Sequence, residues 1–278
     1  MDGGDASQTL RPLALGELLD AAVSVLKARP RAVLAITAVF VIPTQLASAF
    51  VQRGLLSDTS LTQLLNDPSL AGGSTGSRSS GSGIVFLIAL LPSMVLPFVA
   101  GALARLVAAW RAGGDVTTRE ALRAAGRKWW VLLIAWFLSH VAEGLGLVAL
   151  LVPALLLMAL FQVAAPAIVL EDLGPVEGLR RSAGLVGPRF GPVVLAVLAA
   201  TFVQYVLSLM LPLLPQLLAQ VLGSDLGWIP LAIGNSLTSL ITTSFLAGFA
   251  VVLYLDLRVR TEGLDLQLDA DEHFAGGG

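Results

Sequence analysis

Long apolar runs separated by short charged segments dominate the pattern of this chain. The longest stretches from residue 129 to residue 170 and contains Glu143 as its single charged residue. A helix needs about 20 apolar residues to cross the hydrocarbon core of a bilayer, so this run holds two helices, with Pro153 at the turn between them. The whole pattern predicts an all-α membrane helix bundle with six transmembrane helices, at 32–52, 84–110, 129–151, 153–171, 190–222 and 228–257.

A shorter amphipathic segment precedes the first span. Its apolar residues recur at the spacing of one helix face; they are Leu15, Leu18, Leu19, Ala22, Val23 and Leu26. The segment is too short and too polar to cross a membrane. We expect an interfacial helix that lies on the cytoplasmic surface with its apolar face toward lipid.

Two further segments repeat this pattern. With an offset of 160 residues, "GELLDAAVSVLKARPRAVL" aligns without a gap to the stretch after Gly174, and Glu17 falls on Glu177. A looser copy, "TTREALRAAGRKWWVLL", precedes the third span, where Thr117 and Glu120 form the sequence signature of a capping box. The sequence therefore predicts a threefold repeat of one interfacial helix and one two-helix hairpin. The alternative is that any amphipathic helix before a span resembles any other, but the gap-free match favours duplication.

The basic residues predict the orientation. Of the 17 Lys and Arg residues, all but Arg53 and Arg78 fall on one side of the six-span topology. Because cytoplasmic loops carry the excess of Lys and Arg, both termini are expected in the cytoplasm, with the protein in the plasma membrane and its first span uncleaved. The predicted parts are a disordered N-terminus at 1–12, a membrane domain at 13–260 with a linker at 71–83, and a cytoplasmic tail at 261–278.

Composition supports the membrane assignment and narrows the chemistry. Hydrophobic residues make up 56% of the chain and charged residues 13%, about half the usual share for a soluble domain. The absence of cysteine excludes disulfides and thiolate chemistry, and two histidines leave few metal-binding or nucleophilic constellations. We therefore expect no catalytic residue, cofactor or metal. The net charge of −2 and the membrane setting argue against nucleic acid.

Ionisable residues at membrane depth are candidate functional residues. His140 and Glu143 lie three residues apart in the third span, on one helix face. They fit a proton relay or a cation site. They also fit a self-satisfied pair packed inside the bundle, or a glutamate beside an outward water pocket.

Other polar residues in the spans have packing roles in this interpretation. Gln45, Gln162 and Gln204 are expected to donate hydrogen bonds between helices, and the stripe of Ser236, Ser239, Thr243 and Ala247 favours close helix packing over a polar conduit. Asp256 and Arg260 are predicted to form a local pair. Eight prolines in the apolar runs predict that several spans are kinked or broken.

Basic residues around the three interfacial helices form a predicted cytoplasmic collar that contacts anionic lipid headgroups. Its members are Lys27, Arg29, Arg123, Arg127, Lys128, Arg180, Arg181 and Arg189. The alternative is that these charges only set the topology.

Three stretches carry a resemblance to a known family: "LRPLALGELLDAAVSVL", "FQVAAPAIVLEDLGPVEGLRRSAGLV" and "LYLDLRVRTEGLDLQL". They resemble actinobacterial integral membrane proteins that are often labelled as the membrane domain of glycerophosphoryl diester phosphodiesterase. The resemblance implies a six-helix bundle in the plasma membrane. Phosphodiesterase chemistry in proteins of that name resides in a separate soluble barrel domain, for which this chain has no room, so no catalytic residue carries over.

The expected function is that of a non-enzymatic integral membrane protein. It would act as a scaffold, an accessory subunit or a lipid-interacting subunit, with membrane lipids and a membrane or cytoplasmic protein as its partners. The alternative is a transporter or channel for a small or lipid-like solute that uses the kinked helices and the His140/Glu143 pair.

Overall fold

The computed structural model describes residues 13–56, 82–149 and 151–263, and every secondary-structure element in these ranges is a helix. The predicted N-terminus 1–12, most of the linker 71–83 and most of the tail 261–278 lie outside the described residues. The helices are α1 (Leu15–Ala28), α2 (Pro30–Leu56), α4 (Ser82–Arg111), α5 (Thr118–Arg127), α6 (Trp129–Ala149), α7 (Leu151–Phe161), α8 (Ala164–Leu170), α9 (Pro175–Val186), the 3₁₀ turn η2 (Gly187–Arg189), α10 (Phe190–Met210), α11 (Leu213–Leu226) and α12 (Trp228–Glu262).

Six helical segments in the described ranges are long and apolar enough to cross a membrane. They are Pro30–Ser48, Ser93–Arg111, Trp129–Val148, Val152–Leu170, Pro175–Leu222 and Trp228–Glu262. The prediction of an all-α chain with several helices of membrane-spanning length is confirmed. The fifth segment joins α9 to the helices that follow it, so its length exceeds that of a single span.

Two of the predicted spans are broken. The predicted span 153–171 consists of α7 and α8, separated at Gln162 and Val163, and the predicted span 190–222 consists of α10 and α11. Pro166 lies in the first turn of α8, just after the first break, and Pro212 lies at the second; neither donates a backbone hydrogen bond. A break at membrane depth leaves carbonyl groups without partners. The buried Ser182 of α9 satisfies one of them, because its hydroxyl donates to the carbonyl of Leu160 at 2.6 Å.

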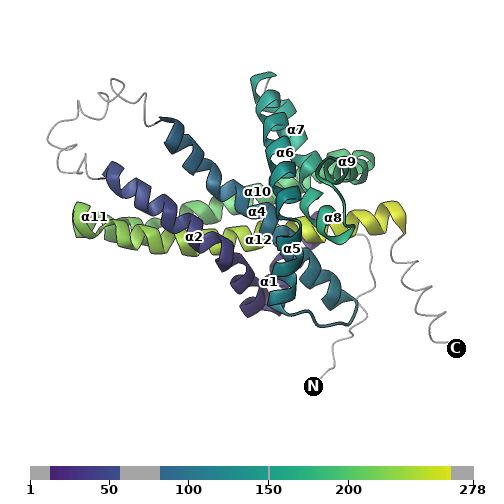
Figure 1. Ribbon diagram of the computed structural model, residues 1–278, viewed down its shortest axis with the longest axis horizontal. Helices are drawn as coiled ribbons and strands as arrows, with labels where there is room; N and C mark the ends of the chain where they lie inside the picture. The colour runs from purple at the N-terminus through teal and green to yellow at the C-terminus, as the bar shows by residue number, and fades with distance from the viewer. Residues whose placement is uncertain (1–12, 57–81, 150, 264–278) are drawn as a thin grey trace.

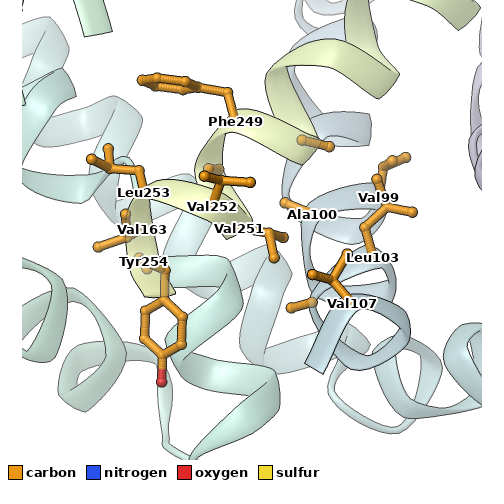
Figure 2. Packing of buried hydrophobic residues seen from close by; sticks show 14 of the residues in the cluster. Val99, Ala100, Leu103, Val107, Val163, Phe249, Val251, Val252, Leu253 and Tyr254 are labelled. Carbon is orange, nitrogen blue, oxygen red and sulfur yellow. The ribbon is translucent and has the colours of Figure 1, made fainter. Parts of the chain in front are cut away.

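The core is built around α12. Its residues from Ala247 to Leu257 are all buried, and their side chains pack against α4 and against Val163 at the α7–α8 break (Figure 2). Phe249 and Tyr254 are among the largest side chains that are completely buried. The hydroxyl of Tyr254 points away from the labelled apolar side chains in Figure 2. The helix that was predicted as the last span is therefore the central one.

The outer helices expose apolar side chains, as expected where lipid is the solvent. Leu145 and Val148 on α6 are 68% and 87% exposed, and Phe202 on α10 is 67% exposed. In Figure 1, the α6–α7 hairpin extends in one direction, and α10, α11 and the N-terminal half of α12 extend in another, with α2 and α4 between them. The helices thus diverge from the region where α1, α5 and α8 lie.

The three amphipathic helices begin in the same way. A glutamate at the third helical position accepts a hydrogen bond from the backbone N–H of the N-cap residue in each. The bonds run from Ala14 N to Glu17 Oε2 at 2.8 Å, from Thr117 N to Glu120 Oε2 at 3.0 Å, and from Gly174 N to Glu177 Oε2 at 2.9 Å. The backbone N–H and the hydroxyl of Thr117 hold the pKa of Glu120 below its ordinary value. The three glutamates that the sequence aligns are therefore equivalent in geometry.

These three helices also pack in the same sense. α5 packs on α4 and α9 packs on α8, so each lies on the last helix before it, and α1 packs on α12 at the other end of the chain. Each also contacts a second helix that packs beside the first. α5 contacts α2, which packs on α4; α9 contacts α6, which packs on α8; and α1 contacts α10, which packs on α12. The contacts therefore follow a closed cyclic order.

Candidate functional site

A cavity of about 280 Å³ lies between α4, α6, α7, α8, α10 and α12. Most of its lining is apolar and comes from residues such as Leu132, Met158, Phe161 and Phe249. Its polar lining residues are Ser93, Trp136, Ser139, His140, Glu143, Gln162, Thr201 and Gln204. An apolar cavity with a few convergent polar groups is typical of a ligand site.

His140 is held in one orientation by its own helix. Its Nδ1 lies 3.0 Å from the carbonyl oxygen of Trp136, which also accepts a bond from Ser139 Oγ at 2.8 Å. The rings of Trp136 and His140 lie with their centroids 4.7 Å apart. Trp136 in turn donates from Nε1 to Ser93 Oγ at 3.3 Å, which connects α6 to α4. The imidazole is therefore fixed by contacts that do not involve Glu143.

Glu143 lines the same cavity one turn further along α6 and is half-buried. Its carboxylate makes no hydrogen bond or ion pair with any residue in the described ranges. His140 and Glu143 thus share a cavity, as their spacing predicts, but the self-satisfied pair does not form. The unpaired carboxylate is open to a group that enters from outside the protein.

The three glutamines differ from one another. Gln45 of α2 donates to Ser239 Oγ of α12, which confirms the predicted bond between helices. Gln204 donates to Ser208 Oγ at 3.3 Å within α10, so the interhelical bond predicted for it is wrong. Gln162 lies at the α7–α8 break and lines the cavity, and its side-chain amide has no partner among the described residues. The cavity thus contains two amides as well as the two ionisable groups.

The hydroxyl groups of α12 form hydrogen bonds with backbone carbonyls of α12 itself and with side chains of α2. In the predicted stripe, Ser236 donates to the Ala232 carbonyl of its own helix at 2.7 Å, and Ser239 accepts the bond from Gln45 of α2. Ser244, which follows Thr243 of the stripe, is 2.8 Å from Thr37 Oγ1 of α2 in a buried contact. Ala247 is fully buried. These contacts agree with a packing role for this face. The predicted pair of Asp256 and Arg260 is confirmed, with Oδ2 and Nε 2.7 Å apart.

A polar network that the sequence did not indicate joins α8, α9 and α12. Arg181 Nε lies 2.7 Å from Glu171 Oε2, and Arg181 Nη2 lies 2.9 Å from Glu171 Oε1. Tyr254 donates to Glu171 Oε1 at 2.6 Å. Glu262 bonds to Arg181 Nη1 at 2.5 Å and to Arg258 Nε at 2.9 Å. The sequence feature that could have indicated this network is Glu171, the charged residue that directly follows the apolar run 129–170.

Three of the predicted headgroup contacts have protein partners. Arg29 pairs with Asp115, Lys128 pairs with Asp172 at 2.8 Å, and Arg181 belongs to the network above. The other predicted residues are exposed and make no hydrogen bond or ion pair within the described ranges: Lys27, Arg123, Arg127, Arg180 and Arg189. Contact with headgroups stays a prediction for all eight. No group of three potential metal ligands occurs among the residues that the structure describes.

Comparison with known proteins gives one family. Residues 139–257 match the model of a family described as "Domain of unknown function (DUF7847)". The matched region extends from Ser139 beside the cavity to the buried end of α12, and it includes His140, Glu143 and the α7–α8 break. No curated protein and no solved structure matches the chain. The description of the family names no activity, so the resemblance to the phosphodiesterase-associated membrane domain stays a prediction.

Proposed function

We propose that this chain is a non-enzymatic integral membrane protein that holds a lipid-like amphiphile in the cavity between α6, α7 and α10. The observation that carries this proposal is the cavity itself, which combines a mainly apolar wall with unpaired polar groups on helices of membrane-spanning length. Such a site suits a molecule with an apolar chain and a polar end.

The shape of the molecule supports an amphiphile over a small polar solute. The α6–α7 hairpin diverges from α10, α11 and α12 (Figure 1), and the cavity lies where these elements approach one another. The volume of about 280 Å³ suits a headgroup and the first part of a chain. The rest of the chain would extend between the diverging helices into the surrounding lipid.

The proposed architecture is a threefold repeat with six spans in the plasma membrane and with both termini in the cytoplasm. The shared glutamate caps of α1, α5 and α9 and the cyclic order of their packing support the repeat. In this arrangement the exposed basic residues lie at the cytoplasmic headgroups, each with a favourable contribution of about 1 kcal/mol near an anionic surface. They would also offer a surface to a membrane or cytoplasmic protein partner.

Transport of a small or lipid-like solute is the second candidate function. The observation that favours it is the break between α7 and α8, which places Gln162 in the cavity. Discontinuous helices that line a cavity are a common feature of transporter binding sites. Binding is required for both functions, so binding is the property to test first.

The test is native mass spectrometry of the protein extracted gently from its own membrane. We expect one defined lipid-like molecule to remain bound to the wild type. Ala165 lines the cavity, so Ala165→Phe should fill it and remove the bound molecule. Ala47→Phe adds the same ring on the exposed surface of α2 and should leave the molecule bound.

Two results would contradict the proposal. One is a wild-type protein that carries no small molecule while it holds a stoichiometric protein partner, which would favour the scaffold role. The other is equal retention of the molecule by Ala165→Phe and Ala47→Phe, which would place the ligand outside the cavity.

A further inference from the structure

Two groups of α6 in the cavity lining, on His140 and Glu143, can accept hydrogen bonds from a ligand. The carbonyl oxygen of Trp136 can only accept a hydrogen bond, so His140 Nδ1, 3.0 Å away, carries the hydrogen. In the neutral ring this leaves Nε2 with a free lone pair. The carboxylate of Glu143, on the same side of α6, accepts but does not donate when ionised.

No Lys or Arg in the described part of the chain pairs with Glu143. Among the described residues that line the cavity there is no Lys or Arg, and His140 is the only other ionisable one. The carboxylate makes no hydrogen bond or ion pair in the described ranges. An unpaired charge inside a membrane is costly, and a ligand that brings the opposite charge removes that cost.

The same groups discriminate against anions. A phosphate or a carboxylate at this end would lie close to Glu143 and would find no basic partner in the described lining. The amides of Gln162 and Gln204 line the cavity as well, and an amide oxygen accepts hydrogen bonds from an amine. The apolar remainder, which includes Met158 and Phe161, suits a hydrocarbon chain.

We propose that the cavity is selective for amphiphiles whose polar end is a protonated amine, which Glu143 and His140 Nε2 bind together. This inference rests on the proposed function, because it names the class of molecule that the cavity holds. The ammonium group donates to both acceptors, and its chain follows the apolar wall between α6 and α10.

The test compares three molecules with the same chain and different polar ends. The protein is placed in phosphatidylcholine nanodiscs that contain octadecylamine, octadecanol or octadecanoic acid at equal mole fraction, and native mass spectrometry counts the retained molecules. We expect the wild type to retain the amine at least about tenfold better than the alcohol, and to retain the acid least.

Variants then assign the preference to Glu143. Glu143→Gln keeps the shape and removes the charge, so it should lower amine retention to the level of the alcohol and leave alcohol retention unchanged. Asp20→Asn removes an exposed carboxylate of α1 and should keep the preference. If Glu143→Gln does not fold, Glu143→Ala is compared in the same way, with gel filtration as the check of folding.

The outcomes separate the two proposals. Equal retention of amine and alcohol by the wild type would overturn the amine selectivity and leave the lipid-like ligand in place. An unchanged preference in a folded neutral variant, or better retention of the acid, would also overturn it. If none of the three molecules is retained, the proposed function fails together with this inference.

Discussion

Tyr254 donates its hydroxyl to Oε1 of Glu171 at 2.6 Å, which connects the buried centre of α12 to the residue that ends α8. The same carboxylate accepts hydrogen bonds from Nε and Nη2 of Arg181 on α9. Glu262 of α12 forms an ion pair with the third nitrogen of that side chain, Nη1. The consecutive helices α8 and α9 and the distant α12 are thus joined through one arginine. This network holds α8 in place, and α8 forms part of the cavity wall.

Removal of Arg181 should therefore weaken the fold. Arg181→Ala removes the two hydrogen-bonded nitrogens that balance Glu171 and leaves Glu262 with Arg258 alone, and we expect a loss of about 1–3 kcal/mol of unfolding free energy. Arg180→Ala is the matched control, because its neighbouring side chain is exposed and makes no hydrogen bond or ion pair in the described ranges; its effect should stay within about 0.5 kcal/mol. Denaturant unfolding in detergent micelles measures both, and equal effects would show that the network does not stabilise the fold.

Close packing of α8 on α9 depends on Gly178. A Cβ atom at this position would lie 2.2 Å from Cγ1 of Ile168, which is fully buried and has little room to move. Gly178→Ala should cost about 1–3 kcal/mol through overpacking. Gly184→Ala, in the same helix with nothing near the added atom, should be neutral or stabilising by up to about 1 kcal/mol. Thermal unfolding of the two variants checks this, and similar melting temperatures would contradict it.

The ion pair of Lys128 and Asp172 predicts a dependence on acidic pH. The hydrogen bond and charge of Lys128 hold the pKa of Asp172 below its ordinary value. The pair therefore contributes stability above the unfolded-state pKa of about 4, and this contribution is lost as the pH falls through the lower folded-state pKa.

Asp172→Asn isolates that contribution. Asn tolerates the left-handed backbone at this position, where φ is 56°, and cannot titrate. Unfolding measured from pH 7 to pH 3 should show that the wild type loses its advantage over the variant below about pH 4. A difference that stays constant over this range would contradict the assigned cause.

The proposed orientation can be tested with single cysteines, since the chain contains none. Arg119→Cys lies on exposed α5, and Ser74→Cys lies in the segment 57–81, outside the described residues. In intact cells a membrane-impermeant maleimide should label only Ser74→Cys, and Arg119→Cys should react after permeabilisation. The wild type provides the unlabelled control. Labelling of Arg119→Cys in intact cells would reverse the orientation.

The sequence predicted the elements better than their connections. Apolar length located the spans, and the spacing of Glu17, Glu120 and Glu177 located three helix starts, because both are local properties of the chain. The breaks at Gln162 and Leu211 were not assigned, since Pro43, Pro92 and Pro97 lie inside long helices, Pro166 lies in the first turn of α8, and only Pro212 of the eight prolines falls between two helices. A proline alone does not determine whether a helix breaks, because the freed carbonyl also needs a hydrogen-bond partner. For the first break this partner is Ser182, which belongs to another helix, α9.

The candidate site was predicted in part. The spacing of His140 and Glu143 placed them on one face, which the shared cavity agrees with. Their separate environments depend on rotamers and on the Trp136 carbonyl, which the spacing does not specify. The Glu171 network was missed because its members lie 10 and 83 residues from Glu171, and only the packing of α9 and α12 brings them together.

The central claim is that a lipid-like molecule occupies the cavity, and photocrosslinking on α6 tests it most directly. The helix has two faces: Trp136 and Ser139 line the cavity, whereas Phe137 and Leu145 are 58% and 68% exposed on the outer surface. A fatty alcohol with a diazirine in its chain is added to the protein in nanodiscs, and peptide mass spectrometry locates the adducts. We predict adducts at Trp136 and Met158 that Ala165→Phe removes. Adducts confined to Phe137 and Leu145, unchanged by Ala165→Phe, would show that the lipid only surrounds the protein and would contradict the account.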